Sequence, residues 1–143
     1  MEEATRFYIS IFKDSKIISI SRYGEAGPGP KGSIMTVVFR LAGQEFMGLD
    51  GGPMFKFSPA VSFVVNCENQ KEVDEYWEKL SKGGEKGVCG WLTDKYGVSW
   101  QIVPIILGKM MIDPDPIKVD RVTKAMLKMK KLDIATLKKA YEG

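Results

Sequence analysis

The spacing of apolar residues divides the first fifty positions into one helix and three strands. In residues 1–12 apolar side chains recur at intervals of three and four, which predicts an amphipathic helix with Glu2 and Glu3 in its first turn. Residues 17–23 predict a short strand, and the glycines and prolines of residues 24–32 allow only a loop. Two further strands, 33–41 and 44–50, are joined by a tight turn at Ala42 and Gly43.

A similar order follows after a connector at residues 51–59. Residues 60–66 predict a strand and residues 70–81 a helix that ends at two glycines. Residues 85–93 predict one strand, and a hairpin turn at 94–97 leads to a last strand at 98–103. The second stretch therefore predicts a βαβββ unit, and the first stretch has the same order without its opening strand.

The final hairpins of the two units are alike in sequence, AGQEFMGLD in the first and YGVSWQIVP in the second. Aligning them places Gly43 on Gly97, Phe46 on Trp100 and Met47 on Gln101. We therefore interpret the chain as two copies of one unit, spanning 1–50 and 60–103, within a domain of residues 1–112.

Residues 113–143 predict a helical arm. Asp113 or Asp115 caps its first helix, with Pro114 or Pro116 in the first turn. A second helix begins near residue 133. The first helix carries an apolar stripe, formed by Val119, Val122, Met126, Leu127 and Met129. This stripe serves either ordinary packing or contact with a second chain.

Composition narrows the possible functions. The chain has 143 residues with 44% hydrophobic and 27% charged side chains, which is ordinary for a globular domain. Its net charge of +3 comes with acidic residues interspersed and no interleaved aromatics, so we expect no nucleic-acid partner. No signal peptide or membrane span is visible, so we expect a cytoplasmic protein with Cys67 and Cys89 reduced and no membrane partner.

The chain contains no histidine. That excludes Ser–His–Asp triads, Cys–His pairs and zinc sites that use histidine. Any acid–base chemistry would depend on carboxylates, lysine, tyrosine or cysteine.

Three segments carry a family resemblance: GGPMFKFSPAVSFVVNC, CGWLTDKYGVSWQIVP and DPDP…AMLKMKKLDIATLKKAYEG. In this order they resemble the PhnB-like branch of the vicinal oxygen chelate superfamily, which includes glyoxalases, extradiol dioxygenases and bleomycin-resistance proteins. The branch is often labelled 3-demethylubiquinone methyltransferase. The resemblance implies an α+β fold in which paired βαβββ units form a curved, cup-shaped mixed sheet, followed here by the helical arm.

Catalytic members of the superfamily hold a divalent metal with four side chains. The resemblance places Gln101, Met47 and Ala60 where ligands would be, and these do not form a site for a hard metal, so we expect none. The branch also begins with a strand before the helix that starts here at Met1. We therefore expect the first strand of the first unit to be missing, which leaves an unpaired sheet edge.

The resemblance and strand alternation together suggest which residues line the cup. Met47, Ser62, Ser99 and Gln101 face it, with the polar residues either contacting a ligand or bonding nearby backbone. Asp50, at the cup rim, either acts as a base or orients a ligand hydroxyl, or it is a turn residue before Gly51 and Gly52. Cys89 is interpreted as a buried thiol rather than a nucleophile, and it joins Gln101 and Ser62 in the site if the protein is an enzyme. Trp91 belongs to the core or the cup wall rather than to a stacking platform.

Three functions remain open on these grounds. The first is a metal-independent small-molecule binding protein, like the bleomycin-resistance proteins. The second is an enzyme acting on a small aromatic or quinone-like substrate, and the third is a scaffold without a ligand.

We expect no cofactor, because the chain lacks the doubly wound sheet and glycine-rich turn that S-adenosylmethionine normally requires. The unpaired edge and the arm's stripe predict a homodimer, with the tail helix of one chain packed on the other.

Overall fold

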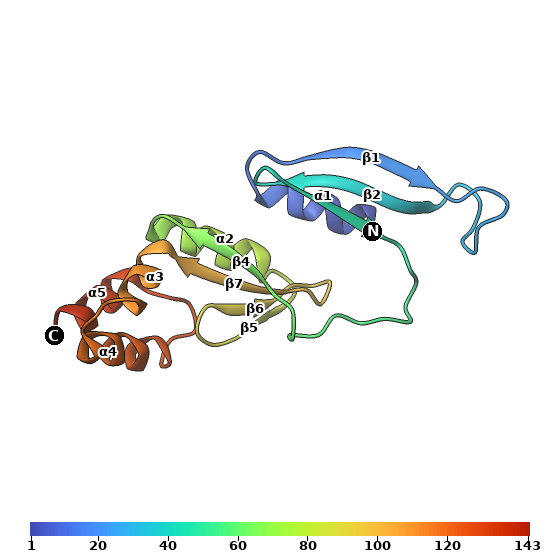
Figure 1. Cartoon of the computed structure of the whole chain (residues 1–143). Helices are drawn as coiled ribbons and strands as arrows, with labels where there is room; N and C mark the ends of the chain where they lie inside the picture. Colours follow the sequence, from blue (N-terminus) through green and yellow to red (C-terminus); the bar gives the residue numbers. More distant parts are fainter. The chain divides into compact units, whose positions relative to one another are not determined.

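The computed structural model describes residues 1–143 as two compact units, Met1–Lys56 and Phe57–Gly143 (Figure 1). The first unit contains α1 (Glu2–Ile11), β1 (Lys16–Arg22), β2 (Ile34–Leu41) and β3 (Gln44–Leu49). The second contains β4 (Phe63–Cys67), α2 (Gln70–Leu80), β5 (Glu85–Lys86), β6 (Trp91–Thr93), β7 (Ser99–Pro104), α3 (Ile105–Met111), α4 (Pro116–Met126) and α5 (Ile134–Glu142). The α+β class and the predicted order of two related units are confirmed.

The first unit is a three-stranded antiparallel sheet in the order β1-β2-β3. Its β2-β3 hairpin turns through two residues with positive φ, Ala42 at 48° and Gly43 at 81°, as the twist of such short turns requires. Helix α1 packs on β2 and β1 and covers the face that carries Val37 and Phe39. β3 is therefore an edge strand of its sheet.

The second unit has the strand order β4-β7-β6-β5, with β4 parallel to β7 and the other pairs antiparallel. Asn69 is the N-cap of helix α2, and its side chain accepts a hydrogen bond of 3.0 Å from the backbone N–H of Glu72. Its apolar face buries Val73 and Trp77 against the sheet. This is the predicted βαβββ order, with helix α2 on one face of the sheet.

The helical arm belongs to the second unit. Its helices form a core cluster with α3 that buries Leu107, Met110, Val122, Leu132 and Leu137. Asp115 is the N-cap of α4 and Pro116 its first residue, which settles the alternatives left open by the sequence. Of the predicted stripe, Val122 is buried and Met126 and Met129 pack against the cluster, whereas Leu127 is exposed. Most of the stripe is thus covered within its own chain.

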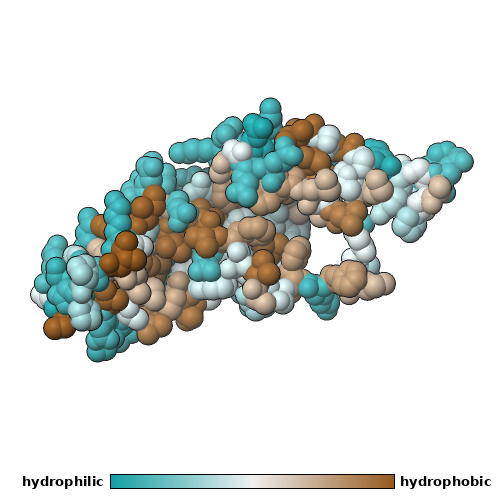
Figure 2. Space-filling view, viewed as in Figure 1, coloured by the Kyte–Doolittle hydropathy of each residue, from teal (hydrophilic) through white to brown (hydrophobic).

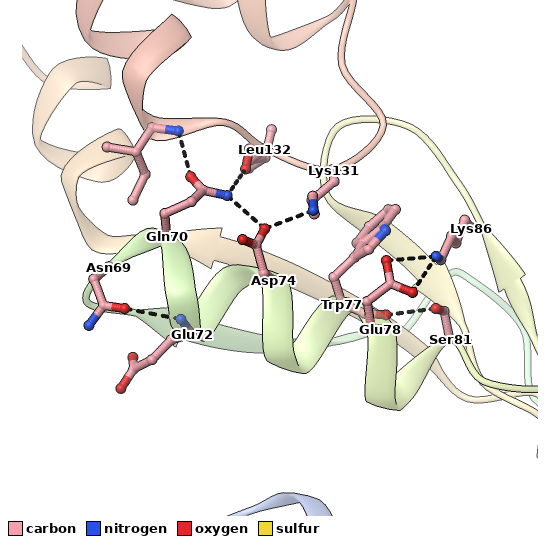
Figure 3. A network of polar contacts seen from close by, with 11 residues as sticks. Asn69, Gln70, Glu72, Asp74, Trp77, Glu78, Ser81, Lys86, Lys131 and Leu132 are labelled. Atoms are coloured by element: carbon pink, nitrogen blue, oxygen red, sulfur yellow. Dashed lines mark hydrogen bonds and ion pairs between the residues drawn. The ribbon is translucent and has the colours of Figure 1, made fainter.

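Gln70 connects this arm to α2 (Figure 3). Its Nε2 donates to the Leu132 carbonyl oxygen at 3.1 Å, and its Oε1 accepts from the Ile134 backbone N–H at 2.8 Å. The Asp74 carboxylate accepts a further bond from Gln70 and pairs with Lys131 at 2.8 Å. One side chain therefore satisfies backbone groups at the start of α5 that would otherwise lack partners.

Two predictions about local structure are wrong, and one helix was missed. Residues 85–93 do not form one strand, because Cys89 and Gly90 adopt positive φ and separate β5 from β6. The strand predicted at 60–66 begins only at Phe63. Helix α3 was not predicted at all.

The segment between β3 and β4 is apolar as well as irregular. It carries Met54, Phe55, Phe57 and Val61, all of them exposed. Figure 2 shows tan and brown side chains along this connection. No helix in the chain has the length and apolar character needed to cross a membrane.

Candidate functional site

A row of three side chains crosses the face of the second sheet that α2 leaves uncovered, and we call this row the open face. Strand pairing places Val64 of β4 and Trp91 of β6 on either side of Gln101 of β7. Because side chains alternate along a strand, their neighbours Trp100 and Ile102 point to the opposite face, where both are buried. Gln101 and Trp100 thus lie on opposite faces of the sheet, as the alternation predicts.

Gln101 is held in place by a residue outside the strands. Its Nε2 donates a hydrogen bond of 2.9 Å to the hydroxyl of Ser62, which precedes β4. This bond brings together two of the predicted site residues and fixes the amide plane. The other end of the amide, the side-chain Oε1 of Gln101, is an acceptor that can take a bond from a ligand or water.

The open face is bounded at both ends along β7. Val103, two residues after Gln101, packs against the core cluster of the arm. Ser99, two residues before it, is buried with only 4% of its surface exposed. Of the predicted residues on this face, Gln101 and Trp91 are therefore partly accessible, and Ser99 is covered.

Cys89 lies away from this row, in the loop between β5 and β6. Its φ is 55°, its backbone N–H donates to the Met129 carbonyl oxygen at 2.8 Å, and its Sγ lies 3.6 Å from the Met126 carbonyl oxygen. Gly90 makes a similar backbone bond to Lys130 at 2.7 Å. The loop therefore anchors the arm to the sheet, and Cys89 faces that contact.

The two thiols differ in environment. Burial, with a smaller contribution from the Glu72 carboxylate, raises the pKa of Cys67 to about 12. A thiol with this pKa is almost entirely protonated at neutral pH and is a poor nucleophile. Cys89 is partly exposed, and neither cysteine forms a disulfide.

We expect Ellman's reagent at pH 8 to modify one thiol rapidly in the folded protein and the other only after unfolding. The rapid reaction belongs to Cys89, since Cys67 is buried and protonated. Replacing Cys89 with serine should abolish the rapid phase, and a rapid phase that survives this substitution would contradict the assignment.

Met47 and Asp50 belong to the first unit. Met47 is exposed on the face of its sheet that α1 does not cover, beside Val38. Asp50 follows β3; its carboxylate lies 3.5 Å from the amino group of Met1, and its carbonyl oxygen accepts a bond from the Tyr23 hydroxyl. Both the carboxylate and the backbone carbonyl oxygen of Asp50 thus have partners within the first unit.

A hollow of about 560 Å³ lies beside Asp50, and sequence reasoning missed it. Its walls come from the glycine- and proline-rich loop and from the end of β3, including Tyr23, Pro30, Ile34, Leu49 and Asp50. Gly29 approaches the Tyr23 ring so closely that an added Cβ would lie 2.4 Å from it. The loop is therefore folded over Tyr23, a contact that its composition does not reveal.

The residues present do not fit a metal or S-adenosylmethionine. Met47, Ala60 and Gln101, at the positions the superfamily uses for ligands, offer a thioether, a methyl group and a neutral amide. No group of three histidine, cysteine, aspartate or glutamate side chains is arranged to hold a metal. Neither sheet has the doubly wound parallel order that normally binds S-adenosylmethionine.

Comparison with known proteins shows where the chain has relatives. The family model described as 3-demethylubiquinone-9 3-methyltransferase matches residues 1–103, so the arm lies outside it. A PhnB protein from Bacillus cereus is 44% identical over 72% of this chain and 89% of its own, with a TM-score of 0.66. A protein from Pseudomonas aeruginosa is 19% identical over 71% and 86% of the two chains, with a TM-score of 0.58, and shares the fold. No curated protein matches this sequence.

Proposed function

Since this chain belongs to the PhnB-like 3-demethylubiquinone-9 3-methyltransferase family, we propose that it binds a small organic molecule without a metal, on the open face of its second sheet. The superfamily that the sequence resembles includes the bleomycin-resistance proteins, which serve as the example of small-molecule binding without a metal. The proposal assigns no methyl transfer to the chain, because its residues do not fit the methyl donor.

The observation that carries the proposal is the row formed by Val64, Gln101 and Trp91. Ligand sites combine apolar walls with a small number of fixed polar groups. Here an aliphatic and an aromatic side chain flank an amide whose orientation is set by Ser62. The ligand class that fits this arrangement is a small aromatic or quinone-like molecule. It would carry a hydroxyl that donates to the side-chain Oε1 of Gln101.

The test is a titration with a panel of phenols, hydroxyquinones and aromatic acids, followed by thermal shift and tryptophan fluorescence. A compound present at 100 times its Kd stabilises the protein by about 2.7 kcal/mol. We expect Gln101→Ala to weaken binding of any hit about tenfold, the cost of one hydrogen bond. Gln44→Ala, which removes an exposed glutamine of the first unit, is the matched control.

Two outcomes would overturn the proposal. One is a panel that produces no stabilisation at millimolar concentration. The other is a hit whose affinity is the same in Gln101→Ala as in the unmodified protein, because that ligand would occupy another place.

We also propose that the protein acts as a homodimer, although one of the two reasons for that expectation has changed. The arm's apolar stripe is mostly buried within its own unit, so it no longer calls for a partner. The edge of β3 remains unpaired.

A further inference from the structure

The loop between β1 and β2 is held in one shape by its own backbone. Residues 24–32 extend beyond the ends of both strands (Figure 1). The Gly32 N–H donates to the Tyr23 carbonyl oxygen at 2.8 Å, and the Tyr23 N–H donates to the Ser33 carbonyl oxygen at 2.9 Å. The two prolines of the loop have a fixed φ, which limits its movement further. The loop therefore provides a wall that is formed before any ligand arrives.

This wall and the end of β3 border the hollow of about 560 Å³ beside Asp50. Small-molecule sites typically have volumes of about 300–1,000 Å³. Every residue that lines the hollow belongs to Met1–Lys56, so it lies within one compact unit. Its apolar lining comes from Pro28, Pro30, Ile34, Leu49 and the ring of Tyr23. The hollow thus has the size and the apolar walls that a small organic ligand needs.

The polar side chains of the lining offer acceptors and no free donor. The Tyr23 hydroxyl donates to the Asp50 carbonyl oxygen at 3.3 Å, and the Ser33 hydroxyl donates to the Pro30 carbonyl oxygen at 2.6 Å. Both hydroxyl protons are therefore committed to the backbone, while the hydroxyl oxygens keep lone pairs that can accept. The Asp50 carboxylate accepts on both of its oxygens. A ligand that matches this lining has to be a donor.

A primary ammonium group complements these acceptors. It has three N–H donors, no acceptor and a positive charge, and its bonds to a carboxylate are charge-assisted. The Met1 amino group lies 3.5 Å from the Asp50 carboxylate, whose side chain is 49% exposed in this pair. Exposed ion pairs contribute little net free energy, so a ligand ammonium group can displace the amino group.

We propose that this hollow binds a small primary amine, with its ammonium group on the Asp50 carboxylate and its aliphatic or aromatic body between the loop and the end of β3. The site shares no residue with the open face, which belongs to the second unit and is proposed to bind a hydroxyl-bearing ligand through Gln101. Either proposal can therefore fail while the other holds.

The test is a titration with phenethylamine, followed by the amide signals of the protein in NMR spectra. We expect the N–H signals of Gly29, Gly51 and Gly52 to shift, because these residues line the hollow. Phenethyl alcohol has the same body with a hydroxyl in place of the ammonium group. It should bind at least about tenfold more weakly, because it cannot form the charge-assisted bond.

Two variants of the same unit make the assignment specific. Asp50→Asn keeps the size of the side chain but removes its charge, and it should weaken phenethylamine binding at least about tenfold. Glu45→Gln makes the same chemical change at an exposed acid outside the hollow and should leave the affinity unchanged. The amide spectrum of each variant without amine shows whether the first unit is still folded.

Leu49→Lys guards against a folding defect in the Asp50 variant. Leu49 lines the hollow and is 60% exposed, so a lysine is accommodated there without burying its charge. Its ammonium group competes for the Asp50 carboxylate and repels a second cation, so this variant should also weaken phenethylamine binding.

The proposal is overturned if phenethylamine at tens of millimolar concentration leaves the three glycine signals unchanged. Equal affinities for the amine and the alcohol would also overturn it, as would Asp50→Asn and Leu49→Lys variants that bind the amine as tightly as Glu45→Gln. Shifts confined to the indole signals of the three tryptophans, which all lie in the second unit, would place the amine elsewhere and contradict it as well.

Discussion

Replacing Leu137 with alanine is expected to lower the free energy of unfolding of the second unit by about 2–5 kcal/mol. Leu137 is fully buried in the cluster that joins α3, α4 and α5. Its removal leaves a cavity whose lining loses dispersion contacts, in addition to the transfer free energy of the lost methyl groups. Urea unfolding followed by tryptophan fluorescence measures this unit selectively, because Trp77, Trp91 and Trp100 all lie within it.

The matched control for this effect is Leu127→Ala. Leu127 lies in the same arm but is 61% exposed, so its truncation should change stability by less than about 0.5 kcal/mol. Equal effects of the two substitutions would mean that the arm does not pack as described.

Replacing Asp94 with alanine is expected to cost about 3 kcal/mol, although Asp94 lies in a turn. Its Oδ1 accepts from the backbone N–H groups of Tyr96 and Val98 at 2.8 and 3.0 Å, and its Oδ2 accepts from the indole Nε1 of Trp100 at 2.8 Å. The indole is buried, so losing this acceptor leaves a donor without a partner in the core.

Two further variants make the Asp94 prediction specific. Asp94→Asn keeps an acceptor for the turn while presenting an amide to the indole, so it should cost less than alanine. Asp120→Ala removes an exposed aspartate of a surface ion pair and should change stability by less than about 1 kcal/mol. The Trp100 indole N–H resonance should shift in both Asp94 variants; an unchanged resonance would show that the bond is absent in solution.

Local signals in the sequence were enough to predict the elements that depend on neighbouring residues. The spacing of apolar residues predicts α1 and α2, and α4 begins at Asp115 and Pro116, one of the two starts that capping chemistry allows. The alignment of the two hairpins places Met47 and Gln101 at equivalent positions. In the structure each lies on the face of its sheet that the unit's helix leaves uncovered. Caps, turns and alternation are properties of consecutive residues, which explains this success.

The interruption at residues 87–90 could not be predicted from its own letters. The N–H groups of Cys89 and Gly90 bond to carbonyl oxygens of Met129 and Lys130, some forty residues later in the chain. Just before this segment, Gly84 lies so close to the backbone of Thr93 that no larger residue fits: an added Cβ would be 2.1 Å from the Thr93 carbonyl oxygen. Contacts distant in sequence bend this segment against its local preference for an extended strand.

By itself, the sequence determined the class of fold, the order of the paired units, the faces on which Met47 of β3 and Gln101 of β7 lie, and the absence of histidine chemistry. Only the tertiary structure decided what covers each apolar surface. It buries most of the arm's stripe against α3 and α5, covers Ser99, and places Cys89 in a loop that contacts the arm rather than in a strand. The physical reason is that the spacing of apolar residues shows which face of a segment is apolar. Whether that face is buried depends on which distant segment packs against it.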